Sequence, residues 1–247
     1  MALRGNNSDL DSPAAFAERA QVLTRKRFLQ LIYSEWAERL SSGTIPGVTI
    51  EIGGGSNPVT ATAFEKIGSF RFDLVRLPGI HVHGDAMNLP IRAQSVANVV
   101  GIDVLHHCQS GEGFFSEMSR ILQVGGQLRL IEPWNNRWSR FVFQRFHPEP
   151  FDPDSSWQLP HGGPMSAANG ALPWIILARD RRKFETLFPN MQVQSITPLM
   201  PLCFALSGGS SHRLSAPGFL YRAIRWMERP LEYLQIGLSA VVVIQKV

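Results

Sequence analysis

The chain has 247 residues, enough for one large domain or two small ones, and its 44% hydrophobic residues exclude an intrinsically disordered protein. Its 24 basic and 20 acidic residues leave a net charge of only +4, well short of the basic bias typical of nucleic-acid-binding proteins. Two cysteines exclude a disulfide framework and a four-cysteine zinc site, and no apolar stretch has the length of a transmembrane helix or the position of a signal peptide. We therefore expect a single cytoplasmic domain over residues 1–247.

Strand and helix patterns alternate through the first half of the chain. An N-terminal helical segment is expected over residues 1–45, with apolar residues at helical spacing between 22 and 40. Short apolar runs then predict strands, and amphipathic runs between them predict helices. The expected strands are 48–52, 69–74, 80–82, 96–102 and 127–131, and the expected helices are 59–67 and 114–122.

The second half is less regular. A helix over 174–188 and two strands over 191–196 and 238–244 are expected. The intervals 134–172 and 199–232 are rich in Pro, Gly, Trp and Phe, which indicates insertions that line a binding site. Apolar strands separated by helices predict an α/β fold, in which a parallel sheet has helices on both faces.

A glycine-rich turn follows the first expected strand, in the run from Glu51 to Asn57 (EIGGGSN). Glycines allow a ligand to approach the backbone, and the next helix offers free N–H groups. Pro58 replaces the third glycine of the dinucleotide-binding fingerprint, which disfavours a pyrophosphate site. Asp73, 20 residues after Gly53, is placed to accept hydrogen bonds from ribose hydroxyls, and Asp85 could accept one from an adenine amine. Helix caps or loop acids are the alternative for both.

In this order and spacing, the motifs resemble the class I S-adenosylmethionine-dependent methyltransferases, in particular bacterial methyltransferases of type 11. Two motifs are more specific than the glycine turn: Asp-Val-Leu-His-His after the fourth strand, and Glu-x-x-Arg-x-Leu-x-x-Gly-Gly before the fifth. The sequence departs from the family at Ala97-Asn98, where an aspartate is usual, and at Gln123-Val124, where Lys-Pro is usual. The matching stretches are 48–57, Asp73, 84–90, 95–107 and 117–133.

The resemblance implies a Rossmann-like sheet of seven mostly parallel strands in the order 3-2-1-4-5-7-6, with the last strand antiparallel and the two insertions forming a cap. It also implies methyl transfer (EC 2.1.1.-), S-adenosyl-L-methionine as cofactor, and a cofactor-binding core over residues 47–133. The positions that match the family's cofactor contacts, or adjoin them, are Glu51, Gly53, Gly54, Gly55, Asn57, Asp73, Leu74, Asp85, Ala86, Met87, Asp103, Val104 and His106.

Four side chains are candidates for acceptor chemistry. His106 and His107 end the fourth strand, where a histidine could deprotonate an acceptor hydroxyl or amine. His147 and Glu149 stand beside prolines in the first insertion and could form an acid–base pair. A structural role is the alternative for each of the four. No metal site is expected, because no further cluster of Cys and His residues lies near His107-Cys108 in the sequence.

The expected acceptor is a small molecule, a sugar or a lipid-linked intermediate. Two alternatives remain, a nicotinamide-dependent Rossmann oxidoreductase and a non-catalytic cofactor-binding scaffold. Glu51 and the missing third glycine argue against the first, and the intact glycine turn argues against the second.

Two basic clusters, 25–27 and 179–183, are expected to be solvated helix faces, so a nucleic-acid partner is not expected. The helical stretch 219–234, with Arg222, Arg225 and Trp226, leaves peripheral contact with a membrane open. Pro230 is expected to interrupt this stretch, and we favour its packing as a lid over the acceptor site.

Overall fold

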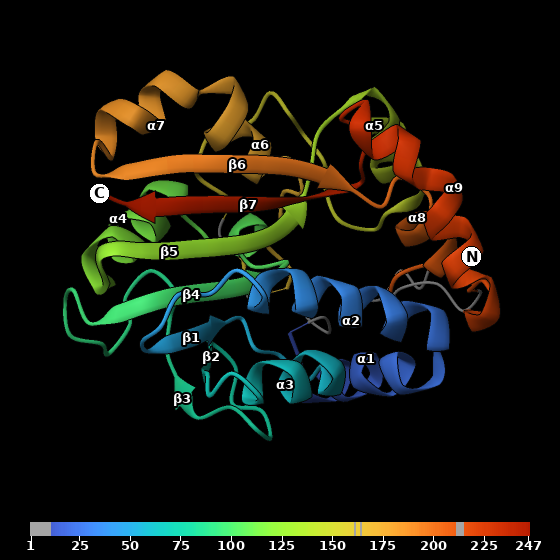
Figure 1. Cartoon of the computed structure of the whole chain (residues 1–247), viewed down its shortest axis with the longest axis horizontal. Coiled ribbons are helices and arrows are strands. Elements are labelled where there is room, and N and C mark those ends of the chain that lie inside the picture. Colours follow the sequence, from blue (N-terminus) through green and yellow to red (C-terminus); the bar gives the residue numbers. More distant parts are fainter. Residues whose placement is uncertain (1–10, 161, 164, 211–214) are drawn as a thin grey trace.

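The computed structural model describes residues 11–160, 162–163, 165–210 and 215–247, and parts of the predicted segments outside these ranges are not described. One seven-stranded sheet runs through the molecule in the order β3-β2-β1-β4-β5-β7-β6 (Figure 1). β7 is antiparallel to both of its neighbours, and the other strands share one direction. The predicted fold class and strand order are therefore confirmed. The strands are β1 (Thr49–Ile52), β2 (Phe70–Asp73), β3 (Val82–His83), β4 (Val96–Ile102), β5 (Leu122–Pro133), β6 (Met191–Leu199) and β7 (Ser239–Lys246).

Helices cover both faces of the sheet, because alternate residues of the central strands enter two separate cores. In β7, Val242 and Ile244 belong to the core under α4, whereas Val241 belongs to the core under α2. The helices are α1 (Pro13–Arg25), α2 (Arg27–Ser41), α3 (Pro58–Glu65), α4 (Gly111–Ile121), α5 (Arg137–Phe146), α6 (Leu172–Trp174), α7 (Arg181–Leu187), α8 (Cys203–Ser207) and α9 (Tyr221–Tyr233). Shorter turns are η2 (Leu105–His107), η3 (Ile175–Arg179) and η4 (Gly218–Leu220).

The expectation of one helix over 22–40 is wrong. Lys26 has non-helical backbone angles (φ −95°, ψ 87°) and separates α1 from α2. Its ammonium group donates to the carbonyl oxygens of Ser207 and Gly209, at 3.3 and 2.8 Å, so a long-range contact fixes the break. The expected helix over 174–188 is likewise divided, into α6, the π-helical turn η3, and α7.

The two insertions contain more regular structure than their composition indicates. α5 lies in the first, where Asn136 caps it through hydrogen bonds from the amides of Trp138 and Ser139. α8 and α9 lie in the second. The expected interruption at Pro230 is also wrong, because α9 continues through it and is anchored by ion pairs on both sides of the proline. Over the described residues, no helix combines the length and apolarity needed to cross a membrane.

Candidate active site

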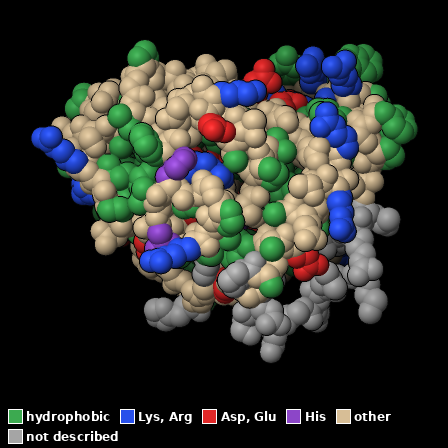
Figure 2. Space-filling model, turned by 90° about the horizontal axis from the view of Figure 1, so that it is seen from below, with side chains coloured by type: hydrophobic (Ala, Val, Ile, Leu, Met, Phe, Trp, Pro, Cys, Tyr) green, Lys and Arg blue, Asp and Glu red, His purple; other side chains and the backbone are tan. Residues whose placement is uncertain are grey.

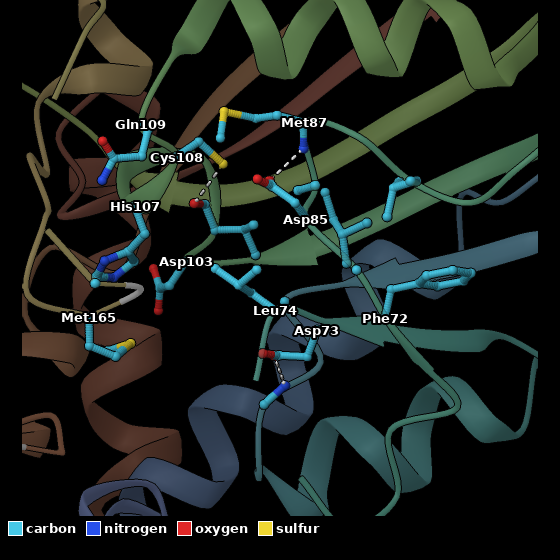
Figure 3. Close-up of a pocket in the computed structure, with 18 of the residues that line it drawn as sticks. Phe72, Asp73, Leu74, Asp85, Met87, Asp103, His107, Cys108, Gln109 and Met165 are labelled. Atoms are coloured by element: carbon cyan, nitrogen blue, oxygen red, sulfur yellow. Dashed lines mark hydrogen bonds between the residues drawn. The ribbon is translucent and has the colours of Figure 1, made fainter. Parts of the chain in front are cut away.

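A pocket opens at the carboxyl ends of β1, β2 and β4, where open α/β sheets bind ligands (Figure 3). Asp73 ends β2, Asp85 follows β3, and Asp103 follows β4, so three carboxylates from separate strands reach one cavity. Phe16 of α1 and Met165 of the first insertion complete the wall. The further lining residues are Ile52, Gly53, Gly55, Phe72, Leu74, Gly84, Ala86, Met87, Leu89, Val104, His107, Cys108, Gln109, Gly162 and Gly163.

The backbone conformation of the turn after β1 requires glycine. Gly53 and Gly55 have φ of 61° and 52°, in the left-handed region that favours glycine. A Cβ on Gly53 would collide with Val104, whereas a Cβ on Gly55 would meet only the carbonyl oxygen of Gly53, at 3.8 Å. The turn therefore leaves space on its pocket side for a ligand to approach the backbone.

Asp73 and Asp85 shape the turns beside the pocket. Asp73 accepts hydrogen bonds from the amides of Gly55 and Val75, at 2.8 and 2.7 Å, one on each carboxylate oxygen. Asp85 accepts from the amide of Met87 at 2.9 Å. Each carboxylate oxygen can accept more than one hydrogen bond, so both side chains keep acceptor capacity for a ligand.

Arg71 stabilises the glycine turn, a role that the sequence analysis did not predict. Its Nε lies 2.6 Å from Oε2 of Glu51, and its other nitrogens donate to the carbonyl oxygens of Gly54, Gly55 and Gly79. Both Arg71 and Glu51 are buried. Glu51 therefore holds the arginine that holds the turn, and it does not line the pocket.

Glu132, at the end of β5, organises the opposite end of the site. One oxygen accepts from the amides of Val104 and Leu105, at 2.9 and 2.7 Å, and the other lies 2.7 Å from Nδ1 of His106. The glutamate is fully buried. It thereby fixes the backbone after β4 and turns Nε2 of His106 toward the first insertion.

The four predicted acceptor-side residues meet around Glu149. Its carboxylate lies 3.5 Å from Nε2 of His106, 4.0 Å from Nε2 of His107 and 3.9 Å from Nδ1 of His147. Nδ1 of His107 lies 3.4 Å from the carbonyl oxygen of Ala167, which orients Nε2 away from the backbone. Of these residues only His107 lines the pocket.

Burial and neighbouring charges strongly shift the pKa values of the residues in this cluster. Burial disfavours the imidazolium of His106, but hydrogen bonds and attraction from Glu132 and Glu149 outweigh it and raise the pKa of His106 to about 10. Burial and repulsion from His106 lower the pKa of His107 to about 4. Burial of Glu149 is outweighed by the His106 hydrogen bond and the nearby histidines, so its pKa lies well below the usual range. His106 is thus protonated at neutral pH, and His107 is neutral.

Asp103 lies beside His107 on the pocket wall (Figure 3). Burial raises its pKa to about 7, with opposition from His106 and further elevation from Glu132 and Glu149. Its backbone φ of 56° lies in the left-handed region, a conformation that Asp and Asn tolerate. A carboxyl with this pKa can exchange a proton near neutral pH.

His106, His107 and Glu149 also offer ligand atoms that all lie within 4.8 Å of one another, a spacing at which a metal ion could bind. The sequence analysis did not predict this proximity, because Glu149 is far from the two histidines in the sequence. The protonated state of His106 between two carboxylates accounts for the same geometry through ion pairing.

Nine of the thirteen residues expected to contact the cofactor line the pocket: Gly53, Gly55, Asp73, Leu74, Asp85, Ala86, Met87, Asp103 and Val104. The other four support it. Gly54 closes the turn by donating to the carbonyl of Phe72, Asn57 caps α3, Glu51 pairs with Arg71, and His106 pairs with Glu132. The sequence analysis missed Phe16 and Met165, whose contribution depends on tertiary packing.

Residues 61–130 match the family model described as a methyltransferase domain. No protein of curated function matches the sequence at a significant level. Among solved structures, the methyltransferase in a Haloferax volcanii complex with the Trm112 methyltransferase activator is similar (TM-score 0.55, 13% identity, 98% of this chain and 97% of that chain).

Two further structures are similar to this chain. Geranyl diphosphate C-methyltransferase from Streptomyces coelicolor, solved with Mg²⁺, geranyl diphosphate and S-adenosyl-L-homocysteine, gives a TM-score of 0.53 at 13% identity, with coverage of 89% and 81%. A SAM-dependent methyltransferase from Thermotoga maritima gives 0.52 at 15% identity, with coverage of 97% and 99%. Residues 61–130 thus match a methyltransferase domain, and the chain as a whole has the fold of these methyltransferases.

Proposed function

We propose that the protein transfers a methyl group from S-adenosyl-L-methionine to a small-molecule, sugar or lipid-linked acceptor (EC 2.1.1.-). One observation carries the proposal: a single pocket joins the glycine turn, Asp73 and Asp85 to a polar end that contains Asp103 and His107. The first group suits a nucleoside with an amino-acid tail, and the second suits an acceptor that loses a proton.

The residues of the pocket fit the cofactor. Asp73 would receive the ribose hydroxyls, with Leu74 beside the adenine, and Asp85, Ala86 and Met87 would face the adenine edge. Gly53 and Gly55 would lie beside the amino-acid tail of the cofactor, and the open space at Gly55 would allow that tail to approach the backbone closely. When bound, the cofactor supplies an activated methyl group on its sulfonium, so the protein's task is alignment and exclusion of water.

The polar end supplies groups that can hold and accept the acceptor's proton. Donation from Nδ1 of His107 to the carbonyl of Ala167 leaves Nε2 as the unprotonated nitrogen. Glu149 stabilises positive charge on this ring, and the protonated His106, paired with Glu132, keeps Glu149 ionised and in place. Asp103, with its pKa near 7, is the second proton acceptor on the wall. We assign His106 and His147 to positioning, because neither lines the pocket.

Calorimetry with S-adenosyl-L-methionine, S-adenosyl-L-homocysteine and NADH tests the cofactor. We expect micromolar binding of the first two and none of NADH, and tighter binding of NADH would favour the oxidoreductase. Turnover is then followed as release of S-adenosyl-L-homocysteine with panels of hydroxylated small molecules, sugars and polyprenyl-linked glycans. Binding of the cofactor without acceptor-dependent turnover on any panel would favour the non-catalytic scaffold.

A further inference from the structure

Helix α9 turns Arg225 and Glu228 toward the protein, while large hydrophobic side chains on its other side are exposed to solvent. Phe219 of the preceding turn η4, Trp226 and Tyr233 are 82%, 74% and 86% exposed. Met227 and Leu234 are also exposed. A helix packed on a soluble protein normally shows the reverse pattern, with the apolar stripe facing the core.

An ion cluster holds the inner face of α9. The guanidinium of Arg225 lies 2.7 Å from Glu35 of α2, 2.6 Å from Glu228 and 2.7 Å from Glu232. Glu228, which is fully buried, also accepts from the amides of Leu202 and Cys203. The helix is thus fixed in an orientation that keeps its aromatic side chains outside, which indicates that this face contacts something other than water.

Helix α5 lies at the same end of the molecule as α9 (Figure 1). Nε1 of Trp138 donates to the carbonyl of Pro201 at 2.8 Å, which ties α5 to the segment before α8. The rings of Trp138, Phe141 and Phe146 follow one another along α5, with centroids 6.0 Å apart in each pair, and all three are exposed.

We call the exposed arginines and large hydrophobic side chains of α5, η4 and α9, together with Leu234 directly after α9, the arginine–aromatic face. Its charged members are all arginines, since α5 contains no acid and both acids of α9 turn inward to Arg225. At the right-hand end of Figure 2, where Figure 1 places α9, hydrophobic and basic side chains lie together. The face consists of Arg137, Trp138, Arg140, Phe141, Arg145, Phe146, Phe219, Leu220, Arg222, Trp226, Met227, Arg229, Tyr233 and Leu234.

We propose that the arginine–aromatic face docks the protein on the surface of an anionic phospholipid bilayer. Aromatic side chains favour the interface between headgroups and acyl chains, and each arginine near an anionic surface adds electrostatic attraction. A second copy of the chain is a poorer partner, because a two-fold contact through this face would bring arginines against arginines.

The position of the face relates it to the pocket. α5 ends at Phe146, three residues before Glu149 of the acceptor-side cluster. Docking through α5 therefore brings the bilayer toward the segment that carries Glu149. Docking itself does not depend on methyl transfer, so it is measured without cofactor or acceptor.

Sedimentation with vesicles tests the proposal. The full chain is mixed with phosphatidylcholine vesicles and with vesicles that contain about one-third phosphatidylglycerol. We expect binding to the anionic vesicles, weakened at high salt and at least about tenfold weaker to the neutral ones. The double variant Phe219→Ser/Trp226→Ser, and separately Arg222→Gln/Arg229→Gln, should each lower the anionic partition coefficient about tenfold or more.

Val124→Ser is the matched control, since Val124 is 68% exposed at the start of β5, at the other end of the sheet from α9 (Figure 1). It should bind as the wild type does, and circular dichroism should show that all variants are folded. Failure of the folded wild type to bind anionic vesicles would overturn the proposal. Equal loss in Val124→Ser would also overturn it, as would self-association that the Phe219→Ser/Trp226→Ser variant abolishes in the absence of vesicle binding.

Discussion

Glu132 and His106 form a buried pair in which Oε2 of the glutamate lies 2.7 Å from Nδ1 of the histidine. The other oxygen of Glu132 accepts from two backbone amides after β4. The pair therefore couples the shape of the pocket wall to the charge of the acceptor-side cluster.

Replacement of Glu132 by Gln should expose this coupling. Without the carboxylate, the factor that most strongly favours the His106 imidazolium is lost, so its pKa should fall from about 10 toward or below its ordinary value of 6.5. Titration of the imidazole resonances by NMR measures the change. The wild-type protein is the reference, and an unchanged His106 pKa in the variant would contradict the assignment.

Asp73→Ala should weaken binding of S-adenosyl-L-homocysteine by about 100-fold, or roughly 3 kcal/mol. The substitution removes both the proposed ribose acceptor and the hydrogen bond that holds the amide of Gly55. Calorimetry provides the measurement. Glu65→Ala, which removes an exposed acid from α3, should leave the affinity unchanged, and retained affinity in Asp73→Ala would remove Asp73 from the site.

Arg71→Leu should lower the free energy of unfolding by about 3–5 kcal/mol, because it leaves the buried Glu51 without its partner. Glu51→Gln in the same background should recover part of this loss, since a neutral amide is less costly to bury than an unpaired carboxylate. Urea denaturation of the two single variants and the double variant completes the cycle. Strictly additive losses would show that the two side chains do not act together.

Asp103 should give opposite pH dependences for activity and stability. If it accepts the proton, kcat/KM should rise about tenfold per unit of pH below about 7 and level off above it. Its pKa is higher in the folded state than the unfolded value of 3.8, so its contribution to stability is fully present below that value and is lost as the pH rises through about 7.

Asp103→Asn keeps the tolerated left-handed backbone and removes the charge. Its Tm should exceed that of the wild type at pH 8, and the difference should vanish toward pH 4. The inflection near pH 7 in the activity profile should also disappear. An inflection that persists in Asp103→Asn but is lost in His107→Gln would assign the proton to His107.

Dialysis against EDTA should leave turnover and Tm unchanged, because the protonated His106 lies between the carboxylates of Glu132 and Glu149 and pairs with both. Metal analysis of the dialysed protein accompanies the assay. A loss of turnover that Zn²⁺ or Mn²⁺ restores would instead make His106, His107 and Glu149 metal ligands.

The presence of the glycine turn, Asp73 and Asp85 in one pocket could be predicted from the sequence, because it depends on local order. The glycine turn and the acids that follow successive strands must meet at one edge of a parallel sheet. The role of Arg71 could not be predicted, because its partners Glu51 and Gly79 lie on different elements. The same holds for Glu149, which comes from an insertion and reaches His106 only through tertiary folding. Pro230 misled the helix prediction, since propensity does not account for ion pairs such as Arg225–Glu232.

The amides of Met165 and Ser166 donate to the carboxylate of Asp11, so the N-terminal segment is joined to the first insertion, and Phe16 and Met165 face the same cavity. Departure of a spent cofactor past this wall would require the two segments to separate. The strength of the contact between Asp11 and the first insertion, which is remote from the reacting atoms, would then affect the residence time of the spent cofactor and the rate of successive turnovers.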